Sequence, residues 1–182
     1  MISPCLPPED AVLFYELWYS ILRFVNEKKK LYPGILLDRP YQDNQRAAKE
    51  ISDLLWEAPS LFNEFLAASP YLSPENQQIV KGFKRFVKDT FVAERHLKSG
   101  TILIDSWGVD AYLVKGITVS LKDELDTQLP VYVNTVLLPF KRKIITYGFM
   151  SPFGFFMGPR FKKQMNETYR QIREAGGVLK FM

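Results

Sequence analysis

The C-terminal third of the chain contains two groups of cationic residues within a segment that is otherwise apolar. The first group is Lys141–Lys143, and the second is Arg160, Lys162 and Lys163. Lysine and arginine side chains bind phosphate and carboxylate groups, and exposed aromatic rings beside them stack on nucleobases. Arg95, on an earlier predicted strand, is a further cation that can contact the same anion. The candidate anion-binding residues are therefore Arg95, Lys141, Arg142, Lys143, Arg160, Lys162 and Lys163.

The first group also has a structural interpretation. Residues 137–140 and 144–145 are apolar, so Lys141–Lys143 is typical of the charged turn of a β-hairpin, with Pro139 tolerated near the end of a strand. The stacking interpretation requires that Phe153, Phe155 or Phe156 be exposed. The phenylalanine-rich segment is alternatively a loop that covers a sheet edge, or a surface through which the chain forms a homo-oligomer.

His96 is the only histidine, so a catalytic site of the Ser-His-Asp or Cys-His kind would have to use it. Glu94 and His96 are two residues apart on a predicted strand, and strand alternation places them on one face. A Glu–His pair can perform the acid–base chemistry of a small hydrolase or nuclease. A lone histidine near a strand end is more often a structural residue.

The sequence gives no reason to expect a metal or a cofactor. Cys5 is the only cysteine, so neither a disulfide nor a cysteine-based zinc site can form within one chain. No phosphate-binding or dinucleotide-binding glycine motif is present. No apolar run reaches the length of a membrane span and the first ten residues do not resemble a signal peptide, so we expect a cytoplasmic protein with no membrane partner.

Charge is distributed unevenly along the chain. Residues 1–75 contain 7 Lys and Arg against 11 Asp and Glu, whereas residues 139–182 contain 9 against 2. Such asymmetry is typical of a protein that binds a polyanion, but it also fits attraction between the two ends of the chain or between two copies. The net charge of +4 is itself common among soluble proteins.

The positions of apolar residues divide the chain into two parts. Helical spacing, prolines and capping residues predict four helices between residue 9 and about residue 90, including one that Ser73 caps and Pro74 opens. Shorter segments rich in β-branched and aromatic residues follow, with a final helix from Pro159 that Gly176 and Gly177 terminate. We therefore predict an α+β fold. In this prediction the N-terminal helical half (1–90) packs on a small antiparallel sheet or barrel that a C-terminal helix follows (91–182), and the two parts form one cooperative unit.

Three segments, "FYELWYSILRFVN", "FVAERHLKSGTILI" and "LPVYVNTVLLPFKRKIITYGF", together resemble an uncharacterised family of bacterial cytosolic proteins. The family's characteristic features are a "TVLLPFK-x-KII" segment, here in residues 135–145, and a later "NETY" group, here residues 166–169. The resemblance implies a bacterial cytosolic protein and no particular activity. Some members carry a SEC-C zinc motif, which this sequence lacks.

These patterns favour a non-catalytic binding or regulatory module. Its basic C-terminal half would contact an anionic partner, either RNA or an acidic protein surface. The alternatives are a small hydrolase or nuclease that uses His96 and Glu94, and a homo-oligomeric interaction protein.

Overall fold

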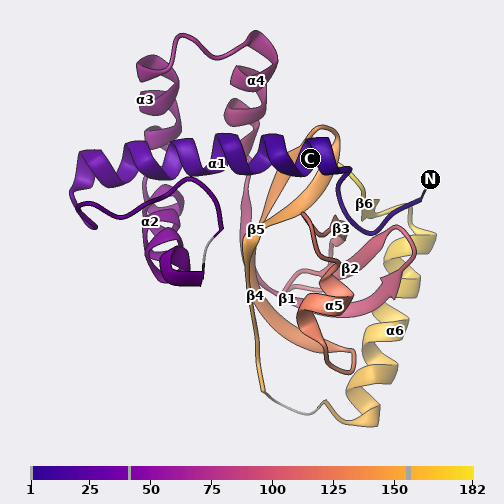
Figure 1. Cartoon of the computed structure of the whole chain (residues 1–182). Helices are drawn as coiled ribbons and strands as arrows, with labels where there is room; N and C mark the ends of the chain where they lie inside the picture. The colour runs from indigo at the N-terminus through magenta and orange to yellow at the C-terminus, as the bar shows by residue number, and fades with distance from the viewer. Residues whose placement is uncertain (1, 41, 155–156) are drawn as a thin grey trace. The chain divides into compact units, whose positions relative to one another are not determined.

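A computed structural model describes residues 2–40, 42–154 and 157–182 (Figure 1). The chain has the predicted α+β fold and divides into two compact units. One is the continuous segment Pro8–Lys84, which is helical; the other combines the N-terminal segment up to Pro7 with Arg85–Met182 and contains the strands. No helix among the described residues is long and apolar enough to cross a membrane.

The helical unit consists of α1 (Pro8–Lys29), α2 (Gln45–Glu57), α3 (Ser60–Ala68) and α4 (Pro74–Phe83). Glu9 and Asp10 lie in the first turn of α1, where acidic residues are favourable. The Ser73 hydroxyl accepts a hydrogen bond from the Asn76 amide of α4 at 3.2 Å, as the capping pattern predicts. Aromatic side chains form the core. The buried Trp18 ring stacks on Phe14 and on Trp56, with centroid distances of 5.9 and 5.7 Å.

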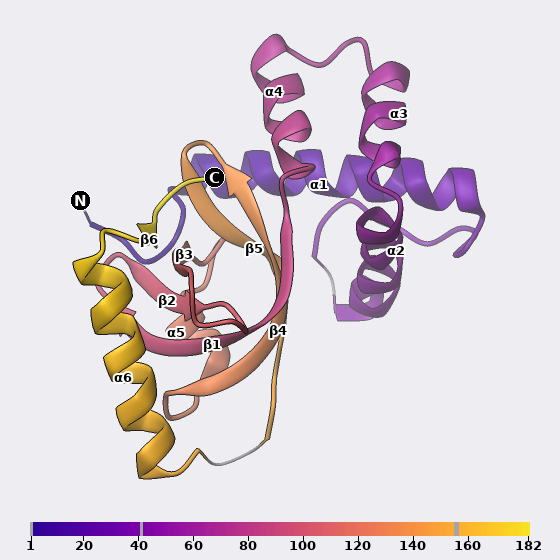
Figure 2. The same ribbon diagram turned by 180° about the vertical axis from the view of Figure 1, so that it is seen from behind.

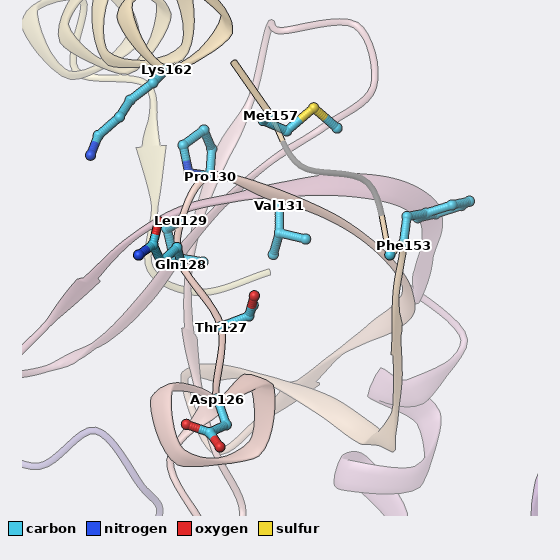
Figure 3. A pocket seen from close by; sticks show the side chains of 10 residues that line it. Asp126, Thr127, Gln128, Leu129, Pro130, Val131, Phe153, Met157 and Lys162 are labelled. Atoms are coloured by element: carbon cyan, nitrogen blue, oxygen red, sulfur yellow. The ribbon is translucent and has the colours of Figure 1, made fainter. Parts of the chain in front are cut away.

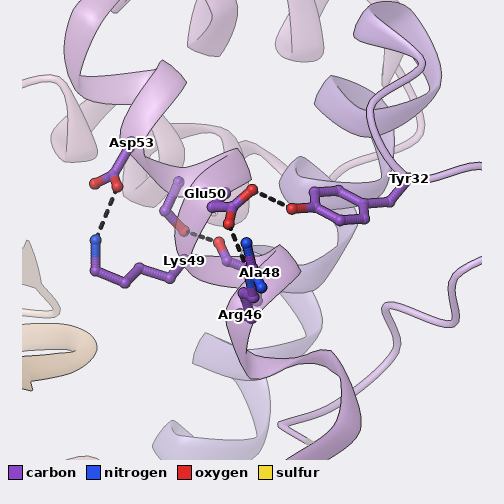
Figure 4. Close-up of polar contacts among 7 residues, drawn as sticks. Tyr32, Arg46, Ala48, Lys49, Glu50 and Asp53 are labelled. Carbon is purple, nitrogen blue, oxygen red and sulfur yellow. Dashed lines mark hydrogen bonds and ion pairs between the residues drawn. The ribbon is translucent and has the colours of Figure 1, made fainter.

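Polar contacts hold the connector that follows α1 against α2 (Figure 4). The Tyr32 hydroxyl donates a hydrogen bond to Glu50, and Arg46 donates to the same carboxylate at 2.9 Å. These contacts lower the pKa of Glu50 and raise that of Tyr32 through the hydrogen bond that joins the two side chains. A short 3-10 helix, Gln42–Asn44, leads from this connector into α2.

Five strands of the second unit form a closed ring. They are β1 (Val87–Leu97), β2 (Gly100–Ile104), β3 (Ala111–Lys115), β4 (Val131–Phe140) and β5 (Lys143–Pro152). Their order is β2-β1-β4-β5-β3, and β2 also pairs with β3, so the ring closes into a small barrel. The two-residue strand β6 (Val178–Leu179) adds to β3.

The prediction of antiparallel pairing holds for four of the five pairings in this ring. The exception is β3–β5, which is parallel, as is the β3–β6 pairing outside the ring. Neighbours in an antiparallel sheet alternate in direction, so a closed ring with an odd number of strands must contain at least one parallel pair. Closure of the five-strand ring therefore requires a parallel pair, and the strand order, which the sequence does not reveal, decides that this pair is β3–β5.

Two helices accompany the barrel: α5 (Leu121–Leu125), which Ser120 caps, and α6 (Pro159–Glu174). The interior is filled by apolar side chains such as Phe91, Leu103 and Val133. On the outside, Met165, Tyr169 and Ile172 of α6 pack against side chains of β1, β2 and β3. Seen from behind in Figure 2, α6 runs along the outside of the barrel.

Candidate anion-binding site

A β-bulge in β1 determines which side chains meet α6. Ala93 pairs with Leu103 and Arg95 pairs with Ile102, so Glu94 is an extra residue without a partner in β2. An extra residue shifts the alternation of side chains by one position. Glu94 and Arg95 consequently lie on the same side of β1, where α6 covers the barrel.

Several contacts hold the guanidinium of Arg95 in place. Its Nε and Nη2 donate to the two carboxylate oxygens of Glu94, and Nη2 also donates to Asn166 Oδ1 at 2.7 Å. The guanidinium carbon lies 4.4 Å from the centre of the Tyr169 ring, a cation–π distance. The Glu94 side chain is only 3% exposed, whereas that of Arg95 is 36% exposed, so a buried carboxylate orients a cation that faces solvent. The hydrogen bond to Glu94 raises the pKa of Arg95.

Helix α6 contributes three further cations near Arg95, which are Lys163, Arg170 and Arg173. Together with Arg95 and Tyr169 they line a hollow of about 550 Å³ between β1 and α6. We call this the arginine hollow and define it by Arg95, Lys163, Arg170 and Arg173 around Tyr169.

The cations of the arginine hollow differ in how their charge is balanced. Arg95 is paired with Glu94, and Arg170 is paired with Glu167 at 2.7 Å and with Glu174 at 3.8 Å. Within the described part of the chain, Lys163 and Arg173 have no carboxylate partner, although the Arg173 guanidinium lies 5.9 Å from the centre of the Tyr169 ring. The hollow is therefore lined by four cations and by the acidic residue Glu167. Two of the cations are not balanced by a carboxylate, so the hollow would attract an anion.

The predicted anion-binding residues do not form one surface. Arg95 and Lys163 share the arginine hollow, and Arg160 and Lys162 lie on the exposed first turns of α6. The turn between β4 and β5 lies at the opposite end of the barrel from the start of α6 in both views (Figure 1, Figure 2). The structure thus separates Lys141–Lys143 from the other candidates.

Residues 141–143 form the hairpin turn that the structural interpretation predicts. Phe140 pairs with Lys143, which leaves Lys141 and Arg142 as a two-residue loop. Both have positive φ, 43° and 58°, the backbone geometry of a type I′ turn, which favours asparagine and glycine. Lys141 and Arg142 therefore occupy positions where the backbone conformation favours smaller residues.

Lys162 belongs to a different hollow, of about 430 Å³, which Figure 3 shows. Residues 126–131, Phe153 and Met157 also line it. The charged groups of Lys162 and Asp126 lie at opposite sides of this hollow and do not converge on one point (Figure 3).

The stacking of nucleobases predicted from the sequence requires an exposed phenylalanine, and the described part of this segment gives it little support. Phe153 is half-buried, and its ring lies 6.4 Å from that of Tyr132 in an edge-on arrangement. Phe155 and Phe156 lie outside the described residues. Among the described residues of the barrel unit, the most exposed aromatic residue is instead Trp107, on the turn between β2 and β3.

The structure gives Glu94 and His96 different partners. His96 pairs with Thr101, and its Nδ1 lies 2.8 Å from the threonine hydroxyl oxygen. Burial lowers the pKa of His96, and the positive charge of Lys122 on α5 lowers it further. Because of the bulge, His96 faces away from the side on which Glu94 meets Arg95. The strand alternation that predicted a Glu–His pair does not hold at this point.

No group of three or more His, Cys, Asp or Glu side chains suited to a metal ion occurs among the residues that the structure describes. Comparisons of the chain with protein-family models, with curated proteins and with solved structures found no match. The resemblance to a bacterial protein family therefore stays a prediction.

Sequence reasoning missed most of the arginine hollow. It included Arg95 and Lys163 but not Asn166, Arg170 or Arg173. A signal was present, because residues 163, 166, 170 and 173 follow helical spacing beside the apolar stripe of α6. Nothing in the sequence indicated that this polar stripe faces β1.

Proposed function

We propose that this chain is a non-catalytic binding module that contacts an anionic partner through the arginine hollow. The observation that carries the proposal is the convergence of Arg95, Lys163, Arg170 and Arg173 on one hollow, with two of these charges unbalanced. The hydrogen bonds from Arg95 to Glu94 and Asn166 also support the proposal, because a guanidinium that is already held in place loses little conformational freedom on binding.

The dimensions of the site favour an extended partner over a small anion. Lys163 and Arg173 are ten residues apart on α6, which corresponds to about 15 Å along a helix axis. This is longer than one phosphate or carboxylate group. The first turn of α6 adds cations and contains no acidic residue to balance them. A partner with charges repeated along its length, such as single-stranded RNA, fits this arrangement.

The experiment is a binding titration of short mixed-sequence single-stranded RNA at about 50 and about 200 mM salt. The test variant is Lys163→Ala combined with Arg173→Ala, which leaves the Arg95–Glu94 pair intact. We expect at least a tenfold loss of affinity at low salt. Each lost phosphate contact on a single strand contributes about 0.7 to the slope of log K against log salt, so the slope should become shallower by about 1.4.

A matched control removes two exposed cations of the helical unit, Lys29→Ala with Lys81→Ala, and changes the net charge equally. Loss of affinity that is equal in both variants would show that only total charge matters. No RNA binding at about 50 mM salt would reject RNA as the partner. Binding of a glutamate-rich peptide that depends on Lys163 and Arg173 would then identify an acidic protein surface instead.

A further inference from the structure

The turn between β2 and β3, residues 105–110, is held rigidly from within. The Asp105 side chain accepts the amide hydrogens of Val109 and Asp110 at 2.8 and 3.2 Å. The Asp105 carbonyl accepts the amide of Gly108 at 3.1 Å, and Gly108 has a φ of 69°, which glycine adopts without strain. The turn is therefore an ordered feature of the barrel.

A second carboxylate fixes the same turn from β1. Asp89 Oδ2 accepts hydrogen bonds from both the amide and the hydroxyl of Ser106, each at 2.9 Å. This contact joins the turn to a neighbouring strand. The position of the residue that follows Ser106 is consequently well determined.

That residue is Trp107, and the turn leaves it in solvent. Its side chain is 85% exposed and that of Val109 is 66% exposed, whereas Trp18 and Trp56 are buried. The hydrogen bonds of the turn involve no part of the Trp107 side chain, so the fold does not require tryptophan here. Tryptophan is the residue type most enriched among the dominant contacts of protein interfaces, and a rigid base reduces the entropy lost on binding.

The charge around Trp107 is negative. The turn carries the carboxylates of Asp105 and Asp110, and Asp89 lies at its base. All three are close enough to raise the pKa of Tyr112, after burial, which is the largest cause. A phosphate chain would be repelled from this turn, whereas an ammonium or guanidinium group would be attracted and could stack on the indole ring.

The turn and the arginine hollow lie on different flanks of α6. A side chain at Gly108 would reach within 3.5 Å of Thr168, so the turn lies beside that residue. The arginine hollow is reached from Asn166, two positions earlier. Two residues correspond to about 200° around a helix, so the two surfaces are separate and have opposite charge.

We propose that the turn formed by residues 105–110 is a docking site for a lysine- and arginine-rich segment of a protein partner, with Trp107 as the apolar anchor. The cationic side chains of that segment stack on Trp107 and are attracted by Asp105 and Asp110, while Val109 extends the apolar contact. This surface is independent of the proposed function of the arginine hollow. One chain would then join an anionic partner to a basic one.

The test is a titration with a fluorescein-labelled arginine-rich peptide, followed by fluorescence anisotropy, with a glutamate-rich peptide of the same length as the comparison. We expect Trp107→Ala to weaken binding at least tenfold and Trp107→Phe to weaken it less. Tyr71→Ala, which removes an exposed aromatic ring of the helical unit, should have no effect. Equal affinity of the wild type and Trp107→Ala would overturn the proposal, as would equal binding of the two peptides.

Two further measurements make the result specific. Asp110→Asn should weaken peptide binding, whereas Glu57→Gln in the helical unit should not. The variant lacking Lys163 and Arg173 should bind the peptide at least as well as the wild type, so failure of RNA binding and failure of peptide binding are distinguishable. Self-association of the wild type that Trp107→Ala abolishes would identify the basic segment as one from a second copy of this chain.

Discussion

Arg95 and His96 are neighbours in the chain, and their side chains have opposite environments. Arg95 is half-exposed, charged and held by a buried carboxylate. His96 is paired with a hydroxyl group, and burial favours its neutral form. At the scale of the residue, therefore, the local environment holds one side chain as a partly exposed cation and favours the neutral form of the other.

The lowered pKa of His96 predicts a pH dependence of stability. Unfolded histidine has a pKa of about 6.5, so as the pH falls below this value the unfolded state takes up a proton that the folded state resists. The free energy of unfolding should decrease until folded His96 is protonated too. Urea titrations at about pH 7.5 and pH 5.5 should show a smaller decrease for His96→Gln than for the wild type.

The wild type and His96→Gln differ only at residue 96, and His96 is the only histidine in the chain. A difference between their pH dependences is therefore due to His96. Identical pH dependence of the two would contradict the prediction. The same variant tests the enzyme alternative, since a hydrolase or nuclease that uses His96 should lose its activity. A pure binder should keep most of its affinity for RNA.

At the scale of the element, two local irregularities of the barrel have distinct consequences. The bulge at Glu94 redirects a pair of charged side chains towards α6. The β4–β5 turn places Lys141 and Arg142 in the left-handed region of φ, which is unfavourable for most residues other than glycine, asparagine and aspartate.

Replacement of the turn by the residues that its geometry favours should stabilise the protein. We expect Lys141→Asn combined with Arg142→Gly to raise the free energy of unfolding by about 1 kcal/mol, because the new residues adopt positive φ with less strain. Chemical denaturation measures this effect. The control, Lys141→Gln with Arg142→Gln, removes the same charges without relieving the backbone.

Equal stabilisation by both variants would show that relief of charge repulsion, rather than backbone strain, is the cause. The same proteins show whether the turn belongs to the anion-binding surface. A loss of RNA affinity in both variants would add Lys141 and Arg142 to that surface. Unchanged affinity would leave them as a charged hairpin turn.

At the scale of the whole molecule, each compact unit has its own core and its own buried tyrosine with a perturbed pKa. Burial raises the pKa of Tyr19 in the helical unit to about 12, and nearby Tyr15 and Asp38 add to the effect. Burial and three aspartates likewise raise the pKa of Tyr112 in the barrel unit to about 12. Both units should therefore respond to alkaline pH.

Unfolded tyrosine ionises at about pH 10, so both side chains stabilise the folded chain below that pH. This contribution should be lost progressively as the pH rises from about 10 to about 12, because only the unfolded state releases the proton easily. Tyr19→Phe and Tyr112→Phe should each reduce the alkaline decrease in the denaturation midpoint. Tyr71→Phe, which changes an exposed ring, should match the wild type. If Tyr19→Phe and Tyr112→Phe also matched the wild type, the contribution of the two buried tyrosines would be contradicted.

Local patterns in the sequence determined much of the fold. The helical segments, the cap at Ser73, the Lys141–Lys143 turn and the final helix from Pro159 were predictable because periodicity, capping and turn geometry depend on residues close together in the chain. Of the candidate cations, Arg95 and Lys163 line one hollow, and their role in anion binding stays a prediction.

Tertiary structure decided the rest, since it depends on pairings between distant residues. Closure of the ring made one strand pairing parallel, and the bulge in β1 turned His96 away from Glu94. Arg95 meets Asn166 across 71 positions of the chain. No local pattern specifies either feature, because the bulge depends on how β1 pairs with β2 and the Arg95–Asn166 contact depends on how α6 packs on the barrel.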